Sequence, residues 1–237
     1  MGTELSLRNG LELAEVTLLD VSAGVTDEAN SPFLLPAGFE QQLVVDRNTA
    51  NGDADFVSTF GNWDMITLDP SNQFIFIPHE VGTGAGLTRY DRNTGDFVTA
   101  LRGNNSNVFE TNPTVWDINN DDFGALDPAE WSPNGTVLTG EEWSGAGRLF
   151  EWMNPLMAAG ETPEVYWRSN IPSVSHEGLK FDASGIMYFV DENNSGSVYK
   201  FVPQDPSDLS LGQTFVLAVD ASTGMLLLTG TMQKRMQ

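Results

Sequence analysis

The stretch from His176 to Val202, HEGLKFDASGIMYFVDENNSGSVYKFV, contains the pattern that decides the fold. Three β-rich runs, Gly178 to Asp182, Ile186 to Val190 and Ser197 to Val202, are separated by Asp-Ala-Ser-Gly and Asn-Asn-Ser-Gly. Such clusters are the turn signals expected between neighbouring antiparallel strands. The sequence therefore predicts a β-meander in this part of the chain.

The same unit occurs twice more upstream, as WDMITLDPSNQFIFIPHE (63–80) and LDPAEWSPNGTVLTGEE (126–142). The three copies align on the turn residues Asp69, Ser132 and Asp182. Each copy has an acid five residues before the turn and another ten or eleven residues after it: Asp64, Asp127 and Glu177, then Glu80, Glu142 and Glu192. Because six acids stand at corresponding places, we expect them to form one shared metal-binding centre.

The spacing of the copies predicts the fold class. The front acids are 63 and 50 residues apart, close to the roughly 40 to 50 residue period of propeller blades. We therefore expect an all-β chain whose residues 1–237 form one partial β-propeller domain of about three blades. A closed ring generally needs at least four blades, so we expect a second chain or a further C-terminal segment to complete it.

Segments outside the copies carry weaker signals. Strand-like runs at Leu11–Leu19 and Gln41–Val45 are expected to supply outer strands, and the polar segment Gly103–Asp122 is expected to be a loop. A short helix is expected at Asn154–Gly160, which has an N-cap residue, a proline at the next position and a terminal glycine. The segment VDASTGMLLLTG near the C-terminus resembles YDRNTGDFVTAL (90–101) and predicts a second outer hairpin.

Composition restricts the partners of the chain. Its 33 acidic and 11 basic residues give a formal net charge of −22, which disfavours nucleic acid and anionic membranes because both need clustered positive charge. Divalent cations are the expected partners, and the alternative is a charge that only maintains solubility. The sequence has no cysteine, so a metal would be held by oxygen and imidazole, without thiolates. No signal peptide and no run of eighteen apolar residues occurs, and no membrane insertion is expected.

Three segments carry a resemblance to a known family. WSPNGTVLTGEEW resembles the TPWGTxLTCEE signature of the PhoX-type alkaline phosphatases, which are secreted propeller enzymes that use iron and calcium. The stretch SHEGLKFDASGIMYFVDENNSGSVYKFVP is similar to the family's HE segment with its following DDE and YKFV. FIFIPHEVGTGAGLTRYDRNTGDF is similar to its upstream NHE segment, and the matches keep their order over residues 36 to 203.

The resemblance implies roles for individual residues. Glu141 and Glu142 would belong to the metal site, Glu177 would be the iron-type ligand at the catalytic centre, and Asp191 and Glu192 would bind calcium or iron. The family's metal-bridging cysteine falls at Gly140, and its downstream arginine segment has no counterpart before the end of the sequence. The resemblance also implies a small phosphorylated substrate and a secreted or periplasmic location, with an export signal outside this chain.

Three functions remain open at this point. The first is hydrolysis of phosphate monoesters at a calcium and iron centre, where the metals neutralise the phosphate and activate an oxygen nucleophile. The second is a non-catalytic, calcium-stabilised extracellular binding module, which the glycine at position 140 favours. The third is a propeller hydrolase of the lactonase or phytase kind. His79 and His176, which each precede a glutamate, are either metal ligands or hydrogen-bonded strand-end residues.

Overall fold

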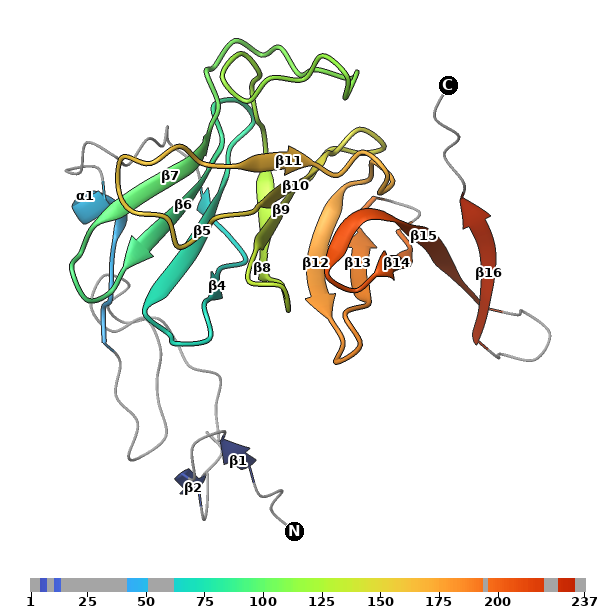
Figure 1. Cartoon of the computed structure of the whole chain (residues 1–237), viewed down its shortest axis with the longest axis horizontal. Helices are drawn as coiled ribbons and strands as arrows, with labels where there is room; N and C mark the ends of the chain where they lie inside the picture. The colour runs from blue at the N-terminus through green and yellow to red at the C-terminus, as the bar shows by residue number, and fades with distance from the viewer. Residues whose placement is uncertain are drawn as a thin grey trace, which may run out of the picture. The chain divides into compact units, whose positions relative to one another are not determined.

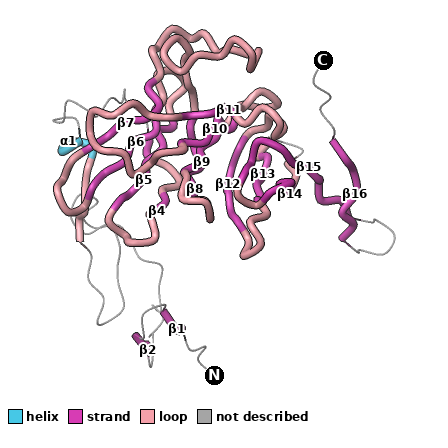
Figure 2. Tube along the Cα trace, in the orientation of Figure 1, coloured by secondary structure: helices cyan, strands magenta, loops and turns pink. Residues whose placement is uncertain are grey.

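The computed structural model describes residues 5–7, 11–13, 42–50, 62–193, 196–219 and 226–232. These residues are all-β apart from one helical turn, α1 (Arg47–Ala50), which confirms the predicted class. By its contacts the chain divides into two units, Met1–Arg47 and Asn48–Gln237, where a single domain is expected from the sequence. The second unit contains three antiparallel sheets, which Figures 1 and 2 show as separate groups of strands.

Each sheet is a meander whose strands are hydrogen-bonded in chain order, except that β3 and β4 in the first sheet both pair with β5. Sheet 1 consists of β3 (Asn62–Trp63), β4 (Thr67–Leu68), β5 (Phe74–Glu80), β6 (Gly86–Asp91) and β7 (Phe97–Arg102). Sheet 2 consists of β8 (Leu126–Trp131), β9 (Val137–Glu141), β10 (Leu149–Trp152) and β11 (Val165–Trp167). Sheet 3 consists of β12 (His176–Phe181), β13 (Met187–Asp191), β14 (Val198–Asp205), β15 (Asp208–Val219) and β16 (Leu226–Met232).

The tight turn of the repeat has the same geometry in all three copies. Asp69, Ser132 and Asp182 each accept hydrogen bonds from two backbone N–H groups of their own turn. The residue three places further has a positive φ in every copy: Asn72 (59°), Gly135 (79°) and Gly185 (78°). Asparagine and glycine are the residues that accept this conformation most readily. The three predicted copies are therefore structural repeats.

The middle sheet is buried on both faces because its strands alternate their side chains between two cores. Val137 and Phe150 belong to a core shared with residues of sheet 1, including Phe76. Leu138 and Leu149 belong to a second core shared with residues of sheet 3. The three sheets therefore pack face to face through sheet 2.

We call the first strand of each sheet its inner strand; in sheets 2 and 3 these strands contact each other, and in sheet 1 both β4 and β5 contact sheet 2. β3 and β4 form the inner strand of sheet 1 because both pair with β5, and β8 and β12 are the inner strands of sheets 2 and 3. β8 lies beside β4, β5 and β12. The Ala129 N–H donates to the Met65 carbonyl at 2.9 Å and joins sheets 1 and 2, while a bridge between Glu142 and Ser175 joins sheets 2 and 3.

The helix predicted at Asn154–Gly160 is wrong, since this segment forms turns. The side chain of Asn154, expected to be the N-cap, accepts hydrogen bonds from Trp152 Nε1 and the Glu164 N–H instead. The carbonyls of Pro155 and Met157 accept hydrogen bonds from the Arg89 guanidinium, at 2.7 and 2.8 Å. The Asn154 side chain and the carbonyls of Pro155 and Met157 are thus hydrogen-bonded to residues outside this segment.

The segments outside the repeats are the connection at residues 103–122, the N-terminal part of the chain and the C-terminal hairpin. Residues 103–122 form no strand or helix, as expected, and Figure 2 shows them as the long connection between β7 and β8. Of the run predicted at Leu11–Leu19, the described residues Leu11–Leu13 form β2, which pairs with β1 (Leu5–Leu7). Residues 14–19 lie outside the described residues, and residues 42–45 form no strand. The second hairpin is present as β15 and β16, at the fourth and fifth positions of sheet 3.

Candidate metal centre

Every inner strand contains a β-bulge at the position of its acid. Between the pairs Trp63↔His79 and Thr67↔Phe76 the inner strand advances four residues while β5 advances three, and Asp64 lies in this interval. β8 advances three residues against two in β9 between Leu126 and Ala129, around Asp127. β12 makes the same shift between Glu177 and Lys180. A bulge redirects a side chain out of the regular alternation, and in each of the three sheets the interval of irregular pairing contains the acid or begins at it.

Asp127 is the most deeply buried of these three acids, with 3% of its surface exposed. Within the described part of the chain, its Oδ2 atom is buried and accepts no hydrogen bond from a donor. Burial, followed by side-chain hydrogen bonds and charge repulsion with Glu177 and Asp64, raises the pKa of Asp127 to about 10. Three carboxyl groups thus share a small volume, which leaves Asp127 protonated at neutral pH in the metal-free protein.

The second set of acids adjoins the first. The side-chain hydrogen bond with Glu192, together with burial and the charges of Glu192, Glu80 and Glu177, raises the pKa of Glu142 to about 7. One ligand atom from each of Asp127, Glu142 and Glu177 lies within 4.8 Å of the others, a separation at which one cation could contact all three.

We call the six acids that act on one another in this way the acid cluster: Asp64, Glu80, Asp127, Glu142, Glu177 and Glu192. These are the six acids at corresponding positions in the three sequence copies. Glu177 is the member that acts on both Asp127 and Glu142, while Glu192 is exposed. The cluster therefore extends from a buried carboxyl group to the surface of the protein.

No positive charge compensates the cluster in the part of the chain that the structure describes. Four ion pairs in this part of the chain join Arg148 to Asp121 and Glu141, Arg168 to Glu151, and Lys180 to Glu130. None of them includes an acid of the cluster. A group of carboxylates without a cation is electrostatically unfavourable unless protons or metal ions bind to it. All-oxygen ligands of this kind suit calcium, and iron also accepts carboxylates.

Two of the predicted ligands have hydrogen-bond partners of their own. Glu141 is 1% exposed, and its Oε2 and Oε1 accept hydrogen bonds from Arg148 Nε and Nη2, both at 2.7 Å. Successive side chains of a strand alternate in direction, which explains why Glu141 and Glu142 have different partners. Asp191 Oδ1 accepts hydrogen bonds from the N–H groups of Ser175 and Asn193, so this carboxylate holds a turn together.

Gly140 and His176 form a close contact beside the cluster. A Cβ atom at Gly140 would lie 2.6 Å from His176 Cβ and 2.9 Å from its Cγ, closer than packed atoms approach. His176 is fully buried, and burial lowers its pKa to about 3, so its imidazole is neutral at pH 7. Its ring packs against the ring of Phe189, and the two ring centroids are 5.4 Å apart. The family's cysteine would therefore displace a core histidine here. His79 is also fully buried.

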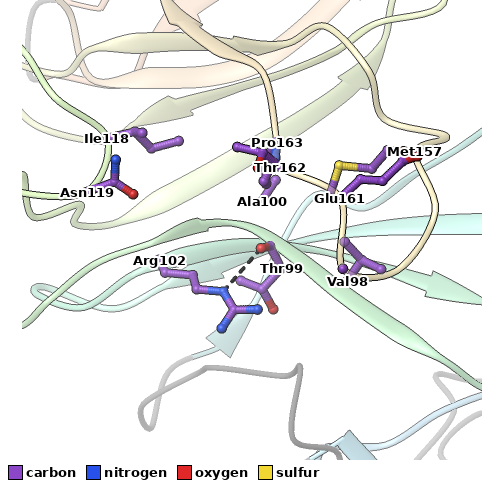
Figure 3. Close-up of a pocket in the computed structure, with 11 residues that line it drawn as sticks. Val98, Thr99, Ala100, Arg102, Ile118, Asn119, Met157, Glu161, Thr162 and Pro163 are labelled. Atoms are coloured by element: carbon purple, nitrogen blue, oxygen red, sulfur yellow. Dashed lines mark hydrogen bonds between the residues drawn. The ribbon is translucent and has the colours of Figure 1, made fainter.

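Two of the cavities among the described residues are large enough for a small molecule, and neither is lined by a member of the cluster. The larger, about 460 Å³, lies between β7 and the turns at Met157 to Pro163. Figure 3 shows Arg102 in this cavity, where its Nε donates to the Thr99 carbonyl at 3.2 Å. The smaller, about 320 Å³, is lined by Glu141 and by Trp143, the residue after Glu142.

The sequence patterns do not indicate the role of Arg148. This buried guanidinium binds Glu141 and Asp121, and it donates from Nη2 to the Asp122 carbonyl at 2.7 Å. The one available signal is that a chain with only 11 basic residues has an arginine close to a Glu-Glu pair. Nothing in the spacing shows which glutamate it binds.

Comparison with models of protein families finds no match to this chain, and comparison with curated proteins finds none either. Among the described residues, no helix has the length and apolar character needed to cross a membrane.

Proposed function

We propose that the acid cluster binds calcium, with iron as a second metal, in a propeller-type domain related to the PhoX-type alkaline phosphatases. The single observation that carries the metal site is the buried Asp127 carboxyl group, which faces the carboxyl groups of Glu177 and Asp64. A divalent cation removes this repulsion and accepts ligands from all three sheets. Calcium takes six to eight oxygen ligands, a number that the cluster and bound water can supply.

The propeller is supported by three meander sheets that pack face to face and share the same turn and the same inner-strand bulge. Closed propellers have at least four blades. The proposed assembly therefore includes strands beyond these three sheets, from a second chain or from a further segment of the same protein. Its proposed location is secreted or periplasmic, where many weak calcium sites of extracellular modules work.

The proposed activity is hydrolysis of phosphate monoesters, and it rests on the sequence resemblance together with the cluster. Bound divalent metal would neutralise the phosphate and supply an activated oxygen nucleophile. Glu177 is the proposed central residue because it acts on both the buried and the more exposed acids. Glu142 and Glu192 would hold the metal at the exposed side, and Asp127 and Asp64 at the buried side.

A non-catalytic calcium-binding module is the second candidate, and one observation favours it. The close approach of His176 to Gly140 leaves no space for the cysteine that bridges metals in the resembled family. In this case the cluster would only hold the three sheets together.

Elemental analysis by mass spectrometry, combined with turnover of p-nitrophenyl phosphate in calcium and iron, tests both candidates. Calcium titration of Glu142→Gln should show affinity at least about tenfold below wild type, since one ligand is lost. Glu161→Gln is the matched control, because Glu161 is an exposed glutamate outside the cluster.

Glu177→Gln should lose both metal and turnover while its circular dichroism remains that of a β protein. Metal binding without turnover in the wild-type protein would favour the binding module. Equal calcium affinity in wild type and Glu142→Gln would contradict the metal site itself.

A further inference from the structure

The smaller cavity lies at the same ends of the strands as the acid cluster. Its lining comes from the β7–β8, β9–β10 and β11–β12 connections, through residues such as Phe109, Trp143 and Ser173. The same connections lead into Asp127 at the start of β8 and Glu177 at the start of β12, and Glu142 directly precedes Trp143. Glu141 lines the cavity and Glu142 belongs to the cluster, so the end of β9 lies between the two sites.

The walls of this cavity are aromatic. The rings of Phe109 and Trp143 have centroids 5.5 Å apart at an angle of 53°, and Trp167 also contributes to the lining. Arg148 lies against the rings of Phe109 and Trp167, at 5.7 and 5.8 Å from their centroids. Aromatic rings favour the offset or edge-on packing of another ring. A volume of about 320 Å³ is also within the range of small-molecule sites.

The charge of the cavity excludes the phosphate group as its occupant. Arg148 is its one lining cation, and its Nε, Nη1 and Nη2 atoms already donate to Glu141, Asp121 and the Asp122 carbonyl. Glu110, another lining residue, is an acid. A phosphate would find acids here and no unused guanidinium donor, whereas an uncharged ring would not be repelled.

We propose that this cavity binds an aromatic ring of an organic ligand, and that in an aryl phosphate it holds the leaving group beside the metal centre. The second clause rests on the proposed phosphatase function, while the ring site stands on the cavity alone. The hydroxyls of Thr111 and Ser173, which line the same cavity, are available to a polar substituent on the ring.

The test uses p-nitrophenol as the ring alone, at a mildly acidic pH that keeps its hydroxyl protonated and the ring uncharged, and measures its binding by equilibrium dialysis in calcium. Phe109→Ala removes one aromatic wall, and Thr111→Trp places a large side chain at an exposed residue of the lining. Loss of an aromatic pair corresponds to about a twofold to tenfold weaker affinity. Thr162→Trp is the matched control, since Thr162 is an exposed threonine that lines the other cavity (Figure 3).

We expect both cavity variants to weaken p-nitrophenol binding and the control to leave it unchanged, with calcium affinity the same in all three. The ring site is overturned if wild type does not bind p-nitrophenol, or if Thr162→Trp weakens binding as much as Thr111→Trp does.

Kinetics then separate the ring site from the phosphatase function. The cavity variants should raise the KM for p-nitrophenyl phosphate and leave that for glycerol 3-phosphate unchanged; an equal rise for both esters contradicts the leaving-group role. If neither ester is hydrolysed while p-nitrophenol still binds, the phosphatase function fails and the ring site holds.

Discussion

At the residue scale, two adjacent glutamates have different partners because their side chains point in different directions from the strand. Glu141 is bound by Arg148, while Glu142 lies within the acid cluster. Removal of Arg148 would leave the carboxylates of Glu141 and Asp121 buried without a cation, a situation that strongly destabilises proteins. The proposed metal binding at this strand end therefore depends on Glu142, and we expect the stability of the fold to depend on its neighbour Glu141.

Gly140→Cys, which restores the family's cysteine, should destabilise the protein. Its Cβ would meet buried His176 atoms at 2.6 and 2.9 Å, so the free energy of unfolding should fall by about 1 to 3 kcal/mol. Gly82→Cys is the matched control because a Cβ there meets nothing within 4 Å. Urea unfolding measures both variants, and equal stability would show that His176 has room to move.

Asp127 makes the stability of the metal-free protein depend on pH. Its pKa is about 10 in the folded chain against an ordinary value of 3.8, so the folded state holds the extra proton between these two values. The contribution of Asp127 to the free energy of unfolding is therefore fully present below about pH 4 and is lost as pH rises toward 10. Glu142, whose pKa rises from 4.5 to about 7, acts in the same direction over a narrower range.

In chelator, thermal unfolding should thus show a Tm that decreases from pH 5 to pH 9. Asp127→Asn should flatten this dependence, because the amide does not titrate. Asp96→Asn changes an exposed acid of the β6–β7 turn and should leave the slope as it is in wild type. A wild-type Tm that rises over this range would contradict the assignment.

At the scale of the element, the inner-strand bulge is the feature that the three sheets repeat. In β12 it contains Gly178, which has a φ of 54° and lies next to Glu177. A side chain at Gly178 would find open space, since no atom lies within 4 Å of its Cβ position. Any effect of substitution there comes from the backbone conformation and not from a steric clash.

Gly178→Val should therefore lower the free energy of unfolding by about 1 to 2 kcal/mol, because a β-branched residue disfavours positive φ. Gly178→Asn should lower it less, since asparagine tolerates this region. Denaturant titration of the two variants gives the comparison. If Val and Asn have the same effect, the bulge is not held in the left-handed conformation.

At the scale of the whole molecule, calcium should stabilise the fold, since the cluster draws ligands from all three sheets. Binding at a hundredfold excess over Kd corresponds to about 2.7 kcal/mol. The Tm should rise with calcium chloride and return when chelator is added. Sodium chloride at equal ionic strength is the control, because a net charge of −22 makes general screening stabilising as well. An equal rise in both salts would indicate screening alone.

The repeat made much of this arrangement predictable. The three sequence copies each have a turn residue with an acid at a fixed distance before it and another after it, and this pattern predicted the meanders. The six corresponding acids do lie together. The roles of Glu141 and Asp191 could not be predicted, because a motif match does not show which way each side chain points. The turns at Asn154–Gly160 were also missed, since Arg89, distant in sequence, binds their carbonyls.

The inner strands have one more consequence, which concerns mechanical force. The six carboxylates come from three sheets, so any pull that separates the sheets must also move the carboxylates apart. Without metal, their mutual repulsion assists the separation. With a shared cation, the same carboxylates resist it. If the cluster binds calcium as proposed, the force needed to unravel this chain from its ends is set by the calcium concentration around it.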